Sequence, residues 1–236
     1  MAAELLGAPI PKRPPGFCTG CPERPVFSAI KLVQRQEDVG EFHISADIGC
    51  HTFAALPPFG IGNTVTGYGL GLASSAGIAP QFAKRTVSIM GDGGFWHNGL
   101  TTGIGGAAYN KHDSVLIIMA NGYSSATGQQ HLPSTTAGGS IQADTVMPME
   151  RALRGLGVTW VRKQYTYKVG KMQKLLHEAL TTKTKGLKVI IAEAECQIAK
   201  QRRLRPLIAK ALNAGKRVVR TRFGVDEDTC TGDHSC

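Results

Sequence analysis

An aspartate held among glycines and a later asparagine carry the strongest chemical signal in the sequence. Asp92 lies in a Gly-Asp-Gly triplet directly after an apolar run at 85–90, and Asn121 directly follows a second run at 114–120. If both runs are parallel strands, their carboxyl ends meet at one edge of the sheet, so the two side chains are expected to lie close together. Mg²⁺ prefers oxygen ligands of this kind, which predicts a Mg²⁺ ion that binds a diphosphate there, with the Tyr123 carbonyl as a further ligand. Without a ligand, the same residues would be two ordinary turns.

Four of the six cysteines lie where loops could bring their thiols together. Cys18 and Cys21 form a C-x2-C pair, and Cys50 and Cys196 each follow a predicted strand. The N-terminus lacks the basic and apolar regions of a signal peptide, so clustered thiols point to metal or redox chemistry rather than to disulfides. Zinc and an iron–sulfur cluster both remain possible for such a site, and Cys196 alone could be a small buried side chain.

The elements that must position these residues alternate along the chain. Strand-length apolar runs separated by helical periodicity predict an α/β fold, with a mostly parallel sheet flanked by helices. The continuous apolar run SVLIIMA at 114–120 is typical of a strand buried on both faces. The polar loop at 121–143 is too long to be idle in a compact domain. Strands are predicted at 41–46, 85–90, 114–120, 158–162 and 188–195, and helices at 26–36, from about 64 to 77, and at 99–109, 148–156, 168–181 and 197–223.

Charge and composition divide the chain into three parts: a proline-rich extended lead-in at 1–17, one domain at 18–196, and a basic extension at 197–236. The formal net charge is +10, and residues 196–225 contain nine Lys or Arg and no acid. Such a run is either a solvated helix face or a docking surface for an acidic partner or a phosphate. No apolar run reaches the length of a transmembrane helix. We therefore expect a cytoplasmic protein without a membrane partner.

Taken together, these motifs resemble the thiamine-diphosphate-binding portion of the 2-oxoacid:ferredoxin oxidoreductases, and most nearly that of the indolepyruvate ferredoxin oxidoreductases. The matching stretches are FCTGCP, HISADIGCHTF, GNTVTGYGLG, MGDGGFWHNGL and IIMANGYSSATGQQHLPS, which together span about residues 16–196. The resemblance implies thiamine diphosphate bound through Mg²⁺ at Asp92, Asn121 and Tyr123. It also implies a [4Fe–4S] cluster bound by Cys18, Cys21, Cys50 and Cys196. The cofactor-binding residues that we expect are Gly49, Cys50, His51, Gly67, Gly91, Asp92, Gly93, Gly94, Asn121, Tyr123, Ser124, Ser125, Ala126 and Thr127.

The resemblance also implies an activity. Such enzymes oxidatively decarboxylate a 2-oxoacid with coenzyme A to an acyl-CoA and pass the electrons through the cluster to ferredoxin; an aryl pyruvate such as indolepyruvate is the implied substrate. His51, His97 and Thr66 are the catalytic candidates. Members of this family take the glutamate that activates the cofactor from a separate domain, and neither 59–77 nor 121–143, the loops expected to face the cofactor, contains a glutamate. We therefore expect an oligomer in which other subunits or domains complete the enzyme.

Two other readings stay open, and the end of the chain departs from the family pattern. A cluster-free thiamine-dependent decarboxylase leaves four placed cysteines unexplained. A zinc-ribbon nucleic-acid-binding protein leaves Asp92 and Asn121 unexplained, so no nucleic-acid partner is expected. The final FGVDEDTCTGDHSC resembles the opening of a truncated ferredoxin-like module, but Asp233 stands where a thiolate is usual. Cys230 and Cys236 are therefore expected to be free thiols.

Overall fold

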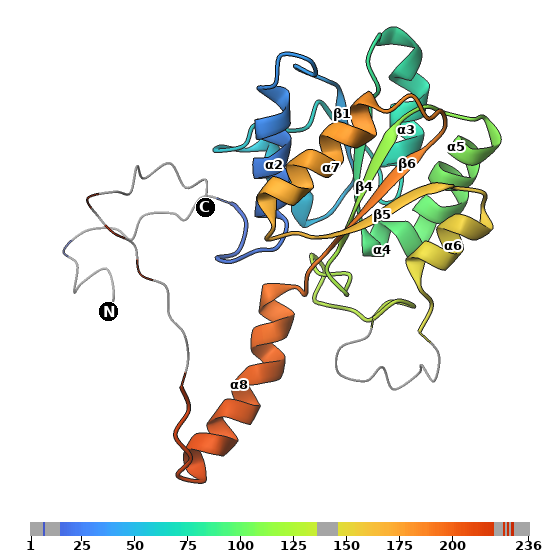
Figure 1. Cartoon of the computed structure of the whole chain (residues 1–236). Coiled ribbons are helices and arrows are strands. Elements are labelled where there is room, and N and C mark those ends of the chain that lie inside the picture. The colour runs from blue at the N-terminus through green and yellow to red at the C-terminus, as the bar shows by residue number, and fades with distance from the viewer. Residues whose placement is uncertain are drawn as a thin grey trace.

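Six parallel strands form one sheet, which confirms the predicted α/β fold (Figure 1). The computed structural model of the chain describes residues 15–135 and 146–219, together with residues 7, 224, 226 and 228. The strand order is β2-β1-β3-β4-β6-β5, so β3 and β4 lie in the middle of the sheet. The strands are β1 (Ile44–Ala46), β2 (Thr64–Val65), β3 (Val87–Gly91), β4 (Val115–Ala120), β5 (Trp160–Tyr165) and β6 (Lys188–Glu193).

Helices cover both faces of this sheet (Figure 1). On one face, α2 (Arg24–Gln34) and α7 (Val169–Thr181) pack against each other. The other face carries α3 (Gly71–Ile78), α5 (Gly106–Tyr109) and α6 (Met149–Gly155).

The side chains of β4 alternate between the two resulting cores. Val115, Ile117 and Met119 pack with residues of α2 and α7, whereas Leu116 and Ile118 pack with residues of α3, α5 and α6. None of the five is more than 1% exposed. The burial of this strand on both faces, predicted from its continuous apolar run, is confirmed.

Two of the predicted helices begin elsewhere. The helix expected from about residue 64 is wrong at its start, because Thr64–Val65 is strand β2 and α3 begins only at Gly71. Gly69 lies between them with φ +82°, a left-handed conformation that interrupts a helix. The helix expected at 99–109 instead starts at Asp92, as α4 (Asp92–Gly94), and runs through a π-helical segment (Phe95–Gly105) into α5. Glycines have low helix propensity, so the sequence carries little helical signal before residue 99.

Helix α8 (Gln197–Asn213) extends away from the rest of the domain (Figure 1). It ends before the predicted residue 223, and Gly215 adopts φ +69° shortly after it, as is common where helices stop. Ala199 is its one buried residue. Among the described residues, no helix is both long enough and apolar enough to cross a membrane. Cys230 and Cys236, most of the predicted lead-in and residues 136–145 of the predicted loop lie outside the described residues.

A network of ion pairs around Asp113 lies at the edge of the sheet where the strands begin. Asp113 precedes β4 and is paired with Arg85 at 2.9 Å and with the fully buried ammonium group of Lys188. Lys185 pairs with the same carboxylate at 3.2 Å. Partial burial alone would raise the pKa of Asp113, but the hydrogen bonds from the three cations outweigh it and lower this pKa to about 2.

Candidate functional site

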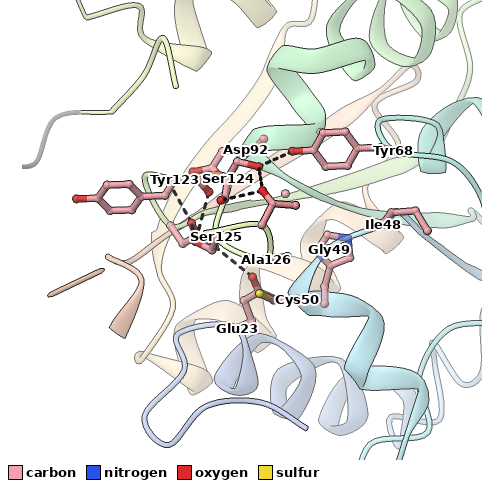
Figure 2. A pocket seen from close by; sticks show the side chains of 16 residues that line it. Glu23, Ile48, Gly49, Cys50, Tyr68, Asp92, Tyr123, Ser124, Ser125 and Ala126 are labelled. Carbon is pink, nitrogen blue, oxygen red and sulfur yellow. Dashed lines mark hydrogen bonds between the residues drawn. The ribbon is translucent and has the colours of Figure 1, made fainter. Parts of the chain in front are cut away.

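A cavity of about 200 Å³ lies at the edge of the sheet where β1, β3 and β4 end (Figure 2). Asp92 and Asn121 both line it, so the structure brings the two side chains together as expected. The wall of the cavity is formed by Glu23, Ile48, Gly49, Cys50, His51, Tyr68, Gly91, Asp92, Gly93, Gly94, Asn121, Tyr123, Ser124, Ser125, Ala126 and Thr127.

Asp92 ties together the ends of the two central strands. One of its oxygens accepts a hydrogen bond from the Gly122 backbone amide at 2.6 Å, and the other accepts one from the Gly93 amide at 3.0 Å. The residue is 1% exposed, and this burial raises its pKa to about 7. A cation beside the carboxylate would favour its charged form, so the electrostatics suit a metal ligand.

Asn121 organises the loop that follows β4. Its amide oxygen accepts hydrogen bonds from the Ser125 hydroxyl at 2.7 Å and the Tyr123 backbone amide at 3.2 Å, and its amide nitrogen donates to Glu23 at 3.3 Å. Ser124 then pairs with Gln130 through the backbone, which folds the loop back on itself. The hydroxyl groups of this loop therefore gather at the cavity wall.

Gly93 and Gly94 leave room for the side chains of Tyr68 and Asp47. Tyr68 reaches the loop after β4, where its hydroxyl lies 2.9 Å from the Ser124 hydroxyl (Figure 2). A Cβ atom at Gly93 would collide with the Tyr68 hydroxyl, and one at Gly94 would collide with a carboxylate oxygen of Asp47. The absence of side chains at both positions is therefore a steric requirement of this packing.

Asp47 fixes the Tyr68 loop in turn. It is buried, and both of its carboxylate oxygens accept the Gly69 backbone amide, at 2.7 and 2.8 Å. The Ile48 amide donates to it as well, at 2.7 Å. Burial raises the pKa of Asp47 to about 6, although these amide hydrogen bonds lower it. Asp47 thus fixes the position of the loop that carries Tyr68 relative to the end of β1.

The four cysteines lie in one region next to the cavity. Burial, together with the charges of Glu23, Cys196 and Cys18, raises the pKa of Cys50 to about 12. Burial also raises the pKa of Cys21, with contributions from Glu23, Cys50 and Cys18. The thiols are thus close enough to influence one another, but among the described residues no three His, Cys, Asp or Glu side chains form a group that could hold a metal ion. The donor set itself, four free thiols, suits an iron–sulfur cluster or zinc.

The three catalytic candidates are placed differently from one another. His51 lines the cavity, is 2% exposed, and has a pKa that burial lowers to about 4, so its ring is neutral at pH 7. His97 and Thr66 do not line the cavity, and neither does Gly67. Thr66 and Gly67 follow β2, the edge strand, which is separated from β3 by β1. The His97 ring packs against the Tyr68 ring, with centroids 5.0 Å apart.

Sequence reasoning missed three lining residues, Glu23, Ile48 and Tyr68. Tyr68 lies within the glycine-rich stretch already assigned to the site, so its position offered a signal. Glu23 follows the C-x2-C pair, and nothing in the sequence shows that this loop reaches the end of β4. Glu23 is 3% exposed, and burial, together with the charge of Asp92, raises its pKa to about 8.

Comparison with known proteins identifies a family that this chain matches. Residues 47–192 match the family described as "Thiamine pyrophosphate enzyme, C-terminal TPP binding domain". The chain is similar to the indolepyruvate oxidoreductase subunit IorA of Archaeoglobus fulgidus, with 34% identity over 83% of this chain and 31% of the relative. It is also similar to the IorA subunit of Thermococcus kodakarensis, with 26% identity over 99% of this chain and 36% of the relative.

Solved structures show the same fold. A 2-oxoglutarate:ferredoxin oxidoreductase from Magnetococcus marinus, solved with 2-oxoglutarate, coenzyme A and succinyl-CoA bound, superposes with a TM-score of 0.64 at 19% identity, over 79% of this chain and 66% of that chain. The chain spans about a third of the length of the curated relatives that it matches.

Proposed function

Since the chain belongs to the thiamine pyrophosphate (TPP) enzymes, whose C-terminal TPP-binding domain it matches, we propose that its cavity binds the diphosphate end of TPP through Mg²⁺. The observation that carries this proposal is the juxtaposition of Asp92 and Asn121, buried at the ends of adjacent parallel strands. Both are oxygen ligands of the type that Mg²⁺ takes, and the Tyr123 carbonyl lies on the same loop.

The remaining wall residues suit a diphosphate. The hydroxyl groups of Ser124, Ser125 and Thr127 can donate to phosphate oxygens, while Gly91, Gly93 and Gly94 let the backbone approach them. Gly49, Cys50, His51 and Ala126 complete the cofactor wall. When bound, the cofactor would supply the electron sink for decarboxylation of a 2-oxoacid. The protein's share is to bind, orient and exclude water.

His51 supports the pocket as a neutral ring. A Cβ atom at Gly49 would overlap the His51 ring, so the backbone of residues 49–51 packs tightly around the imidazole. Neither ring nitrogen has a hydrogen-bond partner among the described residues. We assign His51 to contact with the substrate carboxylate or the diphosphate as a hydrogen-bond donor. His97 and Thr66 stay the other two catalytic candidates, although neither lines the cavity.

For the electrons, we propose a [4Fe–4S] cluster bound by Cys18, Cys21, Cys50 and Cys196. Its support is that Cys50 lies in the cavity wall and that the other three thiols are near enough to interact with it electrostatically. Cluster binding requires thiolates, so it must overcome the raised pKa values of Cys21 and Cys50. Electrons would then pass to ferredoxin.

The proposed substrate is a 2-oxoacid, and the IorA relatives favour an aryl pyruvate such as indolepyruvate. The ligands named for the Magnetococcus structure favour coenzyme A as the second substrate and an acyl-CoA as the product. Because the relatives are subunits about three times as long, we propose that further domains or subunits complete the enzyme.

Helix α8 offers one surface for such an interaction. Its base is fixed by an ion pair between Arg203 and Glu195 at 2.8 Å and by a contact between Arg202 and Gln129. Beyond that base its side chains are largely solvent-exposed, and they include Leu207, at 59%, and Leu212, at 55%.

Titration calorimetry with TPP tests the binding function. The chain should bind TPP when Mg²⁺ is present and lose that binding in EDTA. The reconstituted enzyme, assayed against a panel of 2-oxoacids with coenzyme A and ferredoxin, tests the reaction. The isolated chain should turn over none of these acids, and turnover by it alone would contradict the need for a partner.

A further inference from the structure

Asn121 is bonded at both ends of its side-chain amide. Its oxygen accepts hydrogen bonds from the Ser125 hydroxyl at 2.7 Å and the Tyr123 backbone amide at 3.2 Å. Its nitrogen donates to Glu23 Oε1 at 3.3 Å. An amide oxygen only accepts hydrogen bonds and an amide nitrogen only donates them, so partners of opposite kind fix which way the amide points. Glu23 is the acceptor on the nitrogen side.

Glu23 occupies this position at an energetic disadvantage. It is 3% exposed, lines the cavity, and its second oxygen, Oε2, is buried without a hydrogen-bond partner among the described residues. It immediately precedes α2, yet its side chain does not cap that helix. Burying a carboxyl group with an unpaired oxygen is unfavourable, and helix capping does not account for it.

The carboxyl group cannot easily withdraw. The first turn of α2 is anchored by Val26 and Phe27, both fully buried in the main core. The chain before it is the C-x2-C loop, in which the backbone amide of Cys21 donates to the Cys18 carbonyl at 3.0 Å. Glu23 is therefore held from both sides and presented to Asn121.

We propose that Glu23 is a positioning residue of the cation site, which holds the Asn121 amide so that its oxygen, rather than its nitrogen, faces Ser125 and the cavity. This inference rests on the proposed function, in which that oxygen is a Mg²⁺ ligand. It also joins the two candidate metal sites, because Glu23 lies two residues after Cys21 in the loop that carries the first two thiols.

Mn²⁺ in place of Mg²⁺ allows a direct test on the full 236-residue chain. Binding of Mn²⁺ in the presence of TPP would be measured by electron paramagnetic resonance. Glu23→Ala should weaken Mn²⁺ binding roughly 10- to 100-fold, as is usual when a group that orients a metal ligand is lost. Glu23→Gln keeps an oxygen that can accept from Asn121, and it should stay within about threefold of wild type, a difference of roughly 0.65 kcal/mol. Val26→Ala, which disturbs the same turn of α2 without touching Asn121, should leave the affinity unchanged.

Each outcome is decisive. Wild-type affinity in Glu23→Ala would overturn the inference alone, and equal losses in Glu23→Gln and Glu23→Ala would show that the charge matters rather than the hydrogen bond, which also overturns it. A loss in Val26→Ala as large as that in Glu23→Ala would reduce the role of Glu23 to folding. Failure of the wild-type chain to bind Mn²⁺ with TPP would instead refute the proposed function, and the inference with it.

Discussion

The carboxylate of Asp92 accepts a hydrogen bond from the backbone amide of Gly122 at 2.6 Å, across the ends of two neighbouring strands. Gly91, the last residue of β3, pairs with Met119, so β4 continues only one residue further, to Ala120. This register brings Asp92 and Asn121 to one wall, because each immediately follows its strand.

Steric crowding at Gly93 gives the first prediction. Gly93→Ala should force Tyr68 away from Ser124 and weaken TPP binding, since overpacking of a close contact costs about 1–3 kcal/mol. Tyr68→Phe in the same chain removes the colliding oxygen and should restore part of the loss. Calorimetry of TPP binding with Mg²⁺ measures both effects. A Cβ atom at Gly170, in the first turn of α7, would meet open space, so Gly170→Ala should bind TPP normally. Equal affinities in the two alanine variants would contradict this account.

The Asp113 network gives a pH-dependent prediction for stability. The pKa of Asp113 is lowered to about 2 in the folded protein, against 3.8 as its ordinary value. Stabilisation by its charge is therefore fully present above pH 4 and is lost as the pH falls through about 2. Asp113→Asn should lower the free energy of unfolding by roughly 2–3 kcal/mol at neutral pH.

Urea denaturation at pH 7, 4, 3 and 2 follows this difference. The gap between wild type and Asp113→Asn should be constant from pH 7 to about 4 and should shrink below that value. Glu178→Gln, at an exposed position of α7, should show no such dependence. A gap that stays constant down to pH 2 would mean that the charge of Asp113 does not stabilise the fold.

Iron analysis tests the assignment of the thiols. Purified anaerobically, the chain should contain iron and sulfide, and replacement of Cys18, Cys21, Cys50 or Cys196 by Ala should reduce both. Loss of the cluster should also destabilise the surrounding fold, because metal binding and folding are coupled. Cys230→Ala serves as the control and should keep a full complement. Zinc in place of iron, or four alanine variants with unchanged metal content, would count against the cluster.

The exposed leucines of α8 predict a docking role. Leu207→Ser with Leu212→Ser should change the stability of the isolated chain by less than about 0.5 kcal/mol, as surface substitutions usually do. The same change should weaken association with the remaining domains or subunits of the enzyme, measured by analytical ultracentrifugation at low and high salt. Tyr109 on α5, which is 87% exposed, offers a control site that is distant from α8 in the sequence. Tyr109→Ser should associate normally. Unchanged association of the α8 variant would remove the helix from the interface.

Much of the fold could be predicted because strong local signals agree with it. The run SVLIIMA could form little else than a central strand, and the motif around Asp92 had to follow its strand. Strand Thr64–Val65 was missed because two residues that pair at the sheet edge leave no periodic signal. The helical start at Asp92 was missed because the glycines there have a low helix propensity, which packing overrides.

The site divides in the same way. Gly49, Cys50, His51 and the loop Ser124–Thr127 lie where the strand ends required them. Glu23 reaches the site through its hydrogen bond with Asn121, which lies 98 positions later in the sequence. No local sequence pattern indicates a contact between residues so far apart in the chain. Gly67 was expected at the cavity, but the neighbouring Tyr68 lines it instead.

TPP binding by wild type and Asp92→Ala, measured by titration calorimetry with and without Mg²⁺, tests whether a Mg²⁺ ion held by Asp92 binds the diphosphate. Thermal unfolding without ligand would show that both chains are folded. The wild-type chain should bind TPP only with Mg²⁺, and Asp92→Ala should not bind it under either condition, because the diphosphate loses its metal bridge. Binding of equal affinity by the two chains, or wild-type binding that is indifferent to Mg²⁺, would contradict it.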